Sequence, residues 1–185
     1  IRSPKDAFDL HIGMIHQHFK LVDVFTAAEN IILGLPGDKG KMDKNAVAKA
    51  VREIADRYGF DIDPNQKIYE MSVSQKQTVE IVKVLYRGAD ILILDEPTAV
   101  LTPQETEKLF TVMRNMKKDG KAIIIITHKL HEVLAVSDRV AVLRKGEYIG
   151  DTDTATASQQ SLTDMMVGRA VSLNIDRPLN ENQTE

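Results

Sequence analysis

The sequence contains neither cysteine nor tryptophan, and only 5% of its 185 residues are aromatic. Without cysteine the chain can form no disulfide bond and no cysteine-ligated zinc site, which fits a reducing compartment. The longest apolar runs reach five or six residues, far below the roughly 18 that a membrane-spanning helix needs. The first residues, Ile-Arg-Ser-Pro-Lys, lack the apolar core of a signal peptide. We therefore predict a soluble, cytoplasmic chain.

A surplus of positive charge is also missing. Lysine and arginine number 24 against 27 aspartates and glutamates, which gives a formal net charge of −3. A protein that coats nucleic acid needs a surplus of cations to neutralise phosphates, so this class is disfavoured. Hydrophobic residues make up 43% of the sequence, enough for a packed core. The length fits one domain, or a core with an inserted lobe.

Start and stop signals divide the sequence into short elements. Thr102-Pro103-x-Glu105, for example, combines an N-cap, a first-turn proline and a capping-box acid. Ile91-Leu-Ile-Leu94 is a continuous apolar run, as expected of a strand in a parallel sheet covered on both faces. Helices are predicted at residues 3–11, 26–33, 43–58, 72–86, 102–120, 129–136 and 158–168, and strands at residues 13–17, 91–94, 122–126, 140–143 and 147–150.

The order of these elements predicts an α/β fold with a mostly parallel sheet. A mostly helical block, residues 20–88, interrupts the strands. The final residues are polar and show no periodicity, as in a linker or frayed tail. The predicted parts are a core at 1–19 and 89–150, a helical lobe at 20–88, a helical extension at 151–170 and a tail at 171–185.

Two acidic residues, Asp95 and Glu96, follow the apolar strand at 91–94. Ligands of open α/β sheets bind at the carboxyl ends of the strands. An aspartate there can hold Mg²⁺ on a nucleoside triphosphate, usually through water. The adjacent glutamate can polarise an attacking water. The alternative interpretation of the pair alone is two solvated carboxylates at the end of a strand.

Two further features lie before and after this pair. Thr127-His128 ends the second buried strand; if the two strands are neighbours, His128 reaches the same sheet edge as Glu96 and can donate to a terminal phosphate. Met71-Ser72-Val73-Ser74-Gln75 begins a helix. Serine hydroxyls and free N–H groups at a helix N-terminus can bind an anion, although the capping box alone indicates an ordinary helix start.

Gln17, the helix start at Ser72–Gln75, Leu94-Asp-Glu-Pro97 and Thr127-His128 occur in an order and spacing that resemble the ATP-binding subunit of an ABC transporter. The resemblance extends over about residues 1 to 170. It implies a partial P-loop NTPase core with an inserted helical subdomain. Three segments look closest to the tandem-cassette subfamilies that import simple sugars or nucleosides, and specifically to their first cassette: residues 16–19, 95–105 and 166–169.

The resemblance implies ATP and Mg²⁺ as cofactors and a role for each matched residue. Gln17 matches the Q-loop, which senses metal and water, and Asp95 would hold the metal. Glu96 would activate the water, and His128 would steady the γ-phosphate. The signature-loop residues Ser72, Ser74 and Gln75 would complete the ATP site of the opposite cassette.

The resemblance also implies partners and a location. They are transmembrane permease subunits, a second ATP-binding cassette and, indirectly, a solute-binding protein, at the cytoplasmic face of the membrane. No nucleic acid is expected. The acidic balance, the absence of zinc-binding cysteines and the absence of a long charged coiled coil disfavour the nucleic-acid-linked ABC ATPases.

The sequence departs from the family pattern at several points. It contains no P-loop motif G-x-x-x-x-G-K-[ST], whose backbone cradles phosphates. Gly40-Lys41 is the nearest match, but Leu35 and Met42 occupy key positions. We therefore expect the C-terminal part of a cassette, without the N-terminal strands and the P-loop helix, nearly inactive alone and prone to self-association through an uncovered sheet edge.

Two smaller departures concern the contact with a partner cassette. Ser74 replaces the second glycine of the signature loop, where a side chain costs room beside the γ-phosphate. Thr78 and Thr102 stand where the family usually has arginine and often has aspartate. These changes and the missing P-loop leave an alternative open: a non-catalytic cassette that docks on a permease or a partner cassette.

Other features have mostly structural interpretations. His16 and His18 flank Gln17; a metal-binding pair is one interpretation, and a polar surface pair is favoured. The lysines between 39 and 49 are expected to form a solvated loop and helix face rather than an anion patch, and the methionines are expected to fill the core. The members of these two sets are Lys39, Lys41, Lys44 and Lys49, and Met71, Met113 and Met116.

Overall fold

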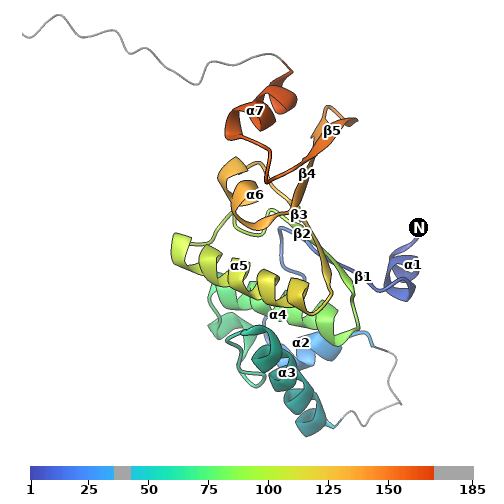
Figure 1. Ribbon diagram of the computed structural model, residues 1–185. Coiled ribbons are helices and arrows are strands. Elements are labelled where there is room, and N and C mark those ends of the chain that lie inside the picture. Colours follow the sequence, from blue (N-terminus) through green and yellow to red (C-terminus); the bar gives the residue numbers. More distant parts are fainter. Residues whose placement is uncertain (36–42, 169–185) are drawn as a thin grey trace, which may run out of the picture. The chain divides into compact units, whose positions relative to one another are not determined.

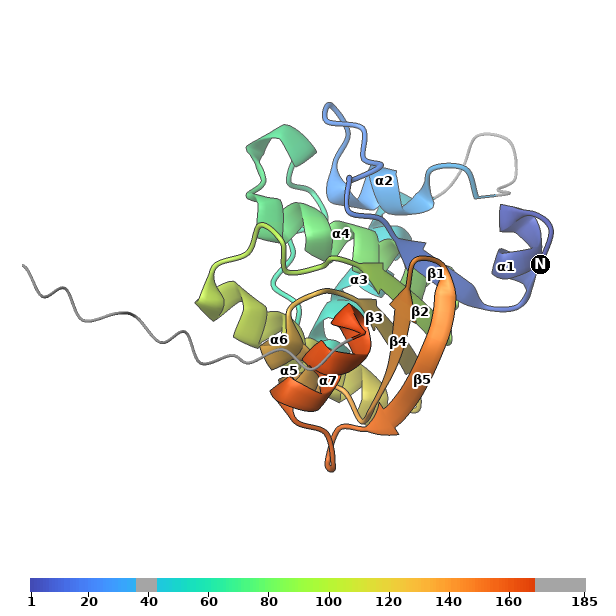
Figure 2. The same ribbon diagram turned by 90° about the horizontal axis from the view of Figure 1, so that it is seen from above.

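The computed structural model describes residues 1–35 and 43–168. Its contacts divide the chain into two units, residues 1–128 and the residues from Lys129 onward, and each unit is described by itself (Figures 1 and 2). The first unit contains α1 (Pro4–Asp9), β1 (Ile12–Ile15), α2 (Ala27–Ile32), α3 (Lys44–Tyr58), the 3₁₀ turn η1 (Ile68–Glu70), α4 (Val73–Tyr86), β2 (Ile91–Asp95), α5 (Pro103–Lys118) and β3 (Ala122–Ile126).

The sheet of the first unit has the order β1-β2-β3, and both pairings are parallel. Ile12 lies opposite Ile91, which in turn lies opposite Ala122. The parallel sheet predicted from the sequence is therefore confirmed. Because the three strands are parallel, the chain leaves all of them at the same edge of the sheet. Residues that follow the strands are therefore brought together at that edge.

One face of this sheet is buried beneath α4 and α5, which pack against β1 and β3 (Figure 1). Leu92 and Leu94 of β2 are completely buried there. Gly13 of β1 allows α4 to approach closely, because a Cβ atom at this position would lie 2.7 Å from the Cβ of Val84. The absence of a side chain at Gly13 therefore sets the distance between β1 and α4.

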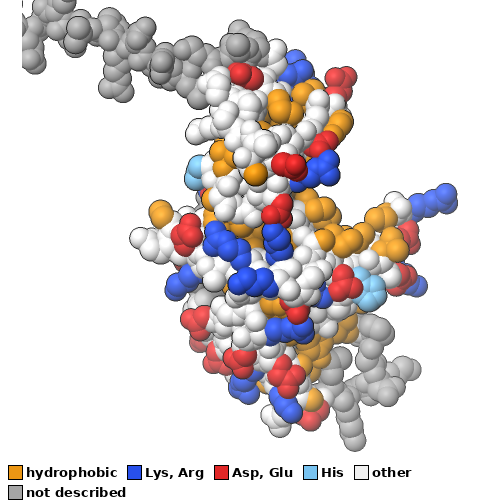
Figure 3. Space-filling view, viewed as in Figure 1, with side chains coloured by type: hydrophobic (Ala, Val, Ile, Leu, Met, Phe, Trp, Pro, Cys, Tyr) orange, Lys and Arg blue, Asp and Glu red, His pale blue; other side chains and the backbone are white. Residues whose placement is uncertain are grey.

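The opposite face of the sheet is apolar and open. Met14, Ile93 and Ile124 lie side by side in the register. Met14 is 41% exposed, Ile124 50% and Ile126 47%. Figure 3 shows apolar side chains at the surface near the strands and the N-terminal helix. Parallel sheets are normally covered on both faces, so within residues 1–128 this face is an uncovered apolar surface.

The helical lobe has a core of its own between α2, α3 and α4. Ile31, Val51, Val79 and Val82 meet there in one buried cluster. Thr26 and Ser72 cap α2 and α4 with complete capping boxes, and Asp43 caps α3. These helix starts are the ones predicted from the sequence, and they account for about 1 kcal/mol each.

The second unit contains α6 (Leu130–Val136), β4 (Arg139–Arg144), β5 (Glu147–Asp153) and α7 (Gln159–Val167). The two strands form an antiparallel hairpin whose turn, Lys145-Gly146, has positive φ at both residues. α7 packs on β4, and Leu162 is fully buried. The hairpin and the last helix are confirmed.

Some predictions concern residues that the structure does not describe. Gly40-Lys41, Lys39, Arg169 and the tail at 171–185 lie outside the described residues. The division into a core, a lobe, an extension and a tail stays a prediction. None of the described helices is long and apolar enough to cross a membrane.

Candidate functional site

The carboxylates of Asp95 and Glu96 stand at the carboxyl edge of the sheet. Asp95 is the last residue of β2 and lies opposite Ile126 of β3. The chain then turns sharply: Glu96 has a φ of 48°, in the left-handed region that side chains disfavour. Its backbone N–H donates to the Ile126 carbonyl at 2.8 Å. This bond fixes Glu96 beside the end of the neighbouring strand.

His128 and Glu96 are in direct contact, as the sequence predicts for two residues at one sheet edge. The Nδ1 atom of His128 lies 2.8 Å from Oε1 of Glu96. The histidine side chain is 74% exposed and that of Glu96 is 20% exposed. The other carboxylate oxygen of Glu96, Oε2, is buried and has no hydrogen-bond partner within the described residues. A carboxylate at the ligand-binding edge of the sheet, in contact with a histidine, is a candidate general base for a bound water.

Gln17 leaves the sheet at the same edge. It comes two residues after the end of β1 and is exposed. Because Ile15 pairs with Leu94, the segment after β1 begins level with Asp95. His16 and His18, on either side, are exposed as well. Gln17, Asp95-Glu96 and His128 thus share one edge.

The oxygen atoms at this edge suit Mg²⁺ better than a transition metal. No group of three or more His, Cys, Asp or Glu side chains in residues 1–35 and 43–168 could hold a metal ion, so the histidines beside Gln17 gain no third ligand there. Mg²⁺ is commonly held by one or two carboxylates together with waters and substrate phosphates. The carboxylate of Asp95 and the amide oxygen of Gln17 fit that mode.

The predicted anion site at the start of α4 is occupied by capping interactions. The Ser72 hydroxyl accepts from the Gln75 N–H at 3.2 Å, and Oε1 of Gln75 accepts from the Ser72 N–H at 2.9 Å. The hydroxyl of Ser74 donates to the carboxylate of Glu105 at the start of α5. Hydrogen bonds from Thr102, and then from Ser74, lower the pKa of Glu105. Ser74 therefore joins two helix starts.

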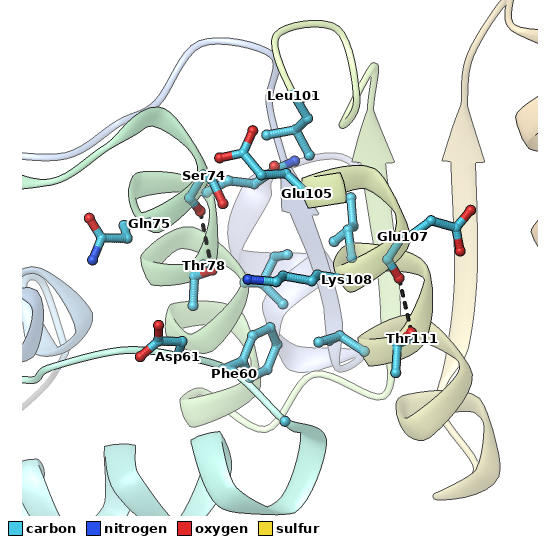
Figure 4. Close-up of a pocket in the computed structure, with 15 residues that line it drawn as sticks. Phe60, Asp61, Ser74, Gln75, Thr78, Leu101, Glu105, Glu107, Lys108 and Thr111 are labelled. Atoms are coloured by element: carbon cyan, nitrogen blue, oxygen red, sulfur yellow. Dashed lines mark hydrogen bonds between the residues drawn. The ribbon is translucent and has the colours of Figure 1, made fainter. Parts of the chain in front are cut away.

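A cavity of about 460 Å³ lies below this junction, between α4, α5 and the end of α3 (Figure 4). Phe60, Ile81 and Leu109 give it apolar walls. In Figure 4 the side chain of Lys108 extends across it toward Thr78. Neither Glu96 nor His128 lines this cavity, so it is separate from the edge described above.

Sequence reasoning missed three polar residues of α4, namely Gln77, Glu80 and Lys83. Gln77 and Glu80 are buried, and both bind the loops that leave the sheet edge. The signal was present, because a spacing of three places them on one side of a helix. Their partners could not be identified without the fold.

Comparisons with known proteins bear on the family and the fold of the chain. Residues 2–99 match the family model described as ABC transporter. The chain is 52% identical over 173 residues to the nucleoside import ATP-binding protein NupA of Lactococcus lactis, covering 93% of this chain and 34% of that protein. It is also 52% identical over 178 residues to the guanosine import ATP-binding protein NupO of Bacillus subtilis (96% and 35%). For the glucose import ATP-binding protein TsgD13 of Haloferax volcanii the identity is 46% over 204 residues (95% and 37%).

The chain thus spans about a third of the length of these relatives. Among solved structures, a dimeric bacterial ABC transporter cassette, MJ0796, matches with a TM-score of 0.68 and 24% identity, covering 83% of this chain and 68% of that one. The ADP conformation of another ATP-binding cassette, MJ1267, gives a TM-score of 0.71 and 23% identity (88% and 67%). These likenesses show that the fold is that of part of an ATP-binding cassette.

Proposed function

The chain belongs to the ABC transporter family, and we propose that it is part of an ATP-binding cassette that hydrolyses ATP to drive import of a simple sugar or a nucleoside. The observation that carries the proposal is the contact of 2.8 Å between Glu96 and His128 beside Asp95. The cargo class is supported by the printed names of relatives that share up to 52% identity with this chain.

Each residue at the sheet edge has a proposed task. Glu96 would accept a proton from the attacking water, which contributes about 10²–10⁴ in rate. His128 binds Oε1 of Glu96 through Nδ1, and its exposed ring would donate to the terminal phosphate through Nε2 when both ring nitrogens carry a proton. Asp95 and Gln17 would hold Mg²⁺, which when bound neutralises charge on the phosphates.

The phosphates themselves need a further cradle. The sequence contains no G-x-x-x-x-G-K-[ST] motif. We infer that the 185-residue chain alone binds Mg-ATP weakly and turns it over slowly. Calorimetric titration should give no detectable binding at about 1 mM. A dissociation constant near 10 μM, equivalent to about −7 kcal/mol, would refute this inference.

The partners follow from the same assignment. We propose that the start of α4, with Ser72 and Ser74, faces the ATP of a second cassette. We also propose that permease subunits bind the cassette at the cytoplasmic face of the membrane, and that a solute-binding protein delivers the cargo to them. The dimeric solved cassette supports the first of these proposals.

The decisive experiment completes the cassette by joining a P-loop segment to Ile1 and measures ATP hydrolysis. We expect Glu96→Gln to lower kcat about 10²- to 10⁴-fold, and His128→Ala to lower it as well. The matched controls are Glu147→Gln and His131→Ala, which alter exposed side chains of the second unit. Equal losses in the controls, or full activity in Glu96→Gln, would refute the assignment.

A second candidate function is a non-catalytic cassette that only docks on its partners. The hydrogen bond from Ser74 to Glu105 favours it, because a side chain stands where the family has glycine. The same Glu96→Gln variant separates the two functions in a transport assay. Unchanged import would indicate docking alone, whereas loss of import supports hydrolysis at this site.

A further inference from the structure

One side of α4 binds both loops that carry the proposed catalytic edge. Gln77 donates from Nε2 to the carbonyl of Pro97 at 2.6 Å, in a buried position. Pro97 directly follows Glu96, so this bond fixes the backbone immediately beyond the proposed base. A buried amide that makes such a bond stabilises the loop by about 1 kcal/mol, and a buried carbonyl left without its donor costs at least as much.

About one and two turns further along the same helix, Glu80 and Lys83 bind a single residue, Lys20. The N–H of Lys20 donates to Oε1 of Glu80 at 2.6 Å. Its carbonyl accepts from Nζ of Lys83 at 3.4 Å. Glu80 and Lys83 also form an ion pair at 3.8 Å, and their side chains are only 10% and 14% exposed. Both polar groups of one peptide residue, three positions after Gln17, are thus held by one ion pair that is mostly buried.

The three residues lie on one side of α4, because three-residue spacing places side chains in neighbouring turns of a helix. The same helix packs closely on β1 at Gly13. A rigid helix that touches both loops sets the distance between them. We propose that Gln77, Glu80 and Lys83 are positioning residues that hold Gln17 and Glu96 in register for hydrolysis, a role that rests on the proposed function.

The side chain at position 80 has two separate roles, as the acceptor for the Lys20 N–H and as the charge partner of Lys83. Glutamine there keeps an oxygen for the Lys20 N–H, whereas alanine removes that acceptor and leaves the mostly buried Lys83 without its charge partner. Loss of a partner from a buried charge pair is more costly than loss of a neutral hydrogen bond. Rescue by Glu80→Gln therefore distinguishes positioning of the loop from a general need for charge.

The first test is amide hydrogen exchange on the 185-residue chain. We expect Glu80→Ala to speed exchange at the Lys20 N–H about tenfold or more, and Glu80→Gln to stay within about threefold of the wild type. The control is Glu53→Ala, which removes an exposed acid of α3. If Glu80→Ala does not fold, Lys83→Met is measured instead, because it removes the hydrogen bond to the Lys20 carbonyl. Unchanged Lys20 exchange in the folded variant overturns the proposal.

The second test uses the completed cassette described above. We expect Gln77→Leu and Glu80→Ala each to lower kcat about tenfold while KM for ATP stays within about twofold, and Glu80→Gln to restore kcat. Equal kcat in all variants overturns the positioning role. Full activity in Glu96→Gln would instead overturn the proposed function. The hydrogen-exchange result would still show whether Glu80 holds the loop at Lys20.

Discussion

The close packing of β1 on α4 gives a quantitative prediction for Gly13→Ala. The added Cβ would meet the Cβ of Val84 at 2.7 Å and that of Ala89 at 3.1 Å. Carbon atoms normally pack at about 3.5–4.0 Å, so the strand and the helix must separate by close to 1 Å. Overpacking of this kind costs about 1–3 kcal/mol. Alanine also restricts the unfolded chain, which offsets about 0.4–1 kcal/mol. At the middle of these ranges, about 2 kcal/mol less about 0.7 kcal/mol, the net destabilisation is about 1.3 kcal/mol.

The assay is urea unfolding followed by circular dichroism, with Gly13→Ala and Val84→Gly measured singly and together. Val84→Gly removes the atom that the new methyl would strike, so the two changes should not be additive. We expect the double variant to be more stable than the sum of the single effects by about 1 kcal/mol. A Gly13→Ala variant as stable as the wild type, or strictly additive effects, would show that the contact between position 13 and Val84 does not limit how closely β1 and α4 approach.

Three further predictions concern the lobe and the open sheet face. Hydrogen bonds from Thr26 and Lys44 lower the pKa of Glu29 to about 2 from 4.5. The contribution of the Glu29 carboxylate to stability is therefore complete above about pH 5 and is lost as the pH falls toward 2. In the Glu29→Gln variant the free energy of unfolding, measured against pH, should therefore fall less between pH 5 and pH 2 than in the wild type. Burial and a hydrogen bond to Asp119 raise the pKa of Tyr58 to about 12; Tyr58→Phe should cost about 1 kcal/mol at pH 7 in urea unfolding, and a neutral effect would contradict the hydrogen bond. The exposed sheet face should cause self-association, which Ile124→Lys should reduce in sedimentation measurements; a wild-type chain that stays a monomer at high concentration would contradict this.

The helix starts and the positions of the strands could be predicted from the sequence because their signals are local, but β3, which was expected to be buried, contains no buried residue. Ser72 and Gln75 form the capping box within one turn, and the apolar run at 91–94 needs no partner to be identified as a strand. The pairing of Glu96 with His128 could also be predicted, because parallel strands place their carboxyl ends at one edge.

The contacts of α4 could not be predicted in the same way. Gln77 and Glu80 bind Pro97 and Lys20, whose positions depend on how the sheet and the lobe come together. Ser74 was expected to help complete the ATP site of an opposite cassette and to take up room beside its phosphate. Its hydrogen bond to Glu105 joins two helix starts that are distant in sequence, and no periodic pattern in the sequence predicts such a contact.

The backbone at Glu96 has a consequence for how this protein tolerates mutation. A non-glycine residue with a φ of 48° carries a conformational cost of about 1–2 kcal/mol, which glycine would not have. A library screened only for folding and expression would therefore enrich glycine at position 96. The variants that such a screen ranks highest would be those that have lost the carboxylate, and stability alone would be a misleading guide for engineering this chain.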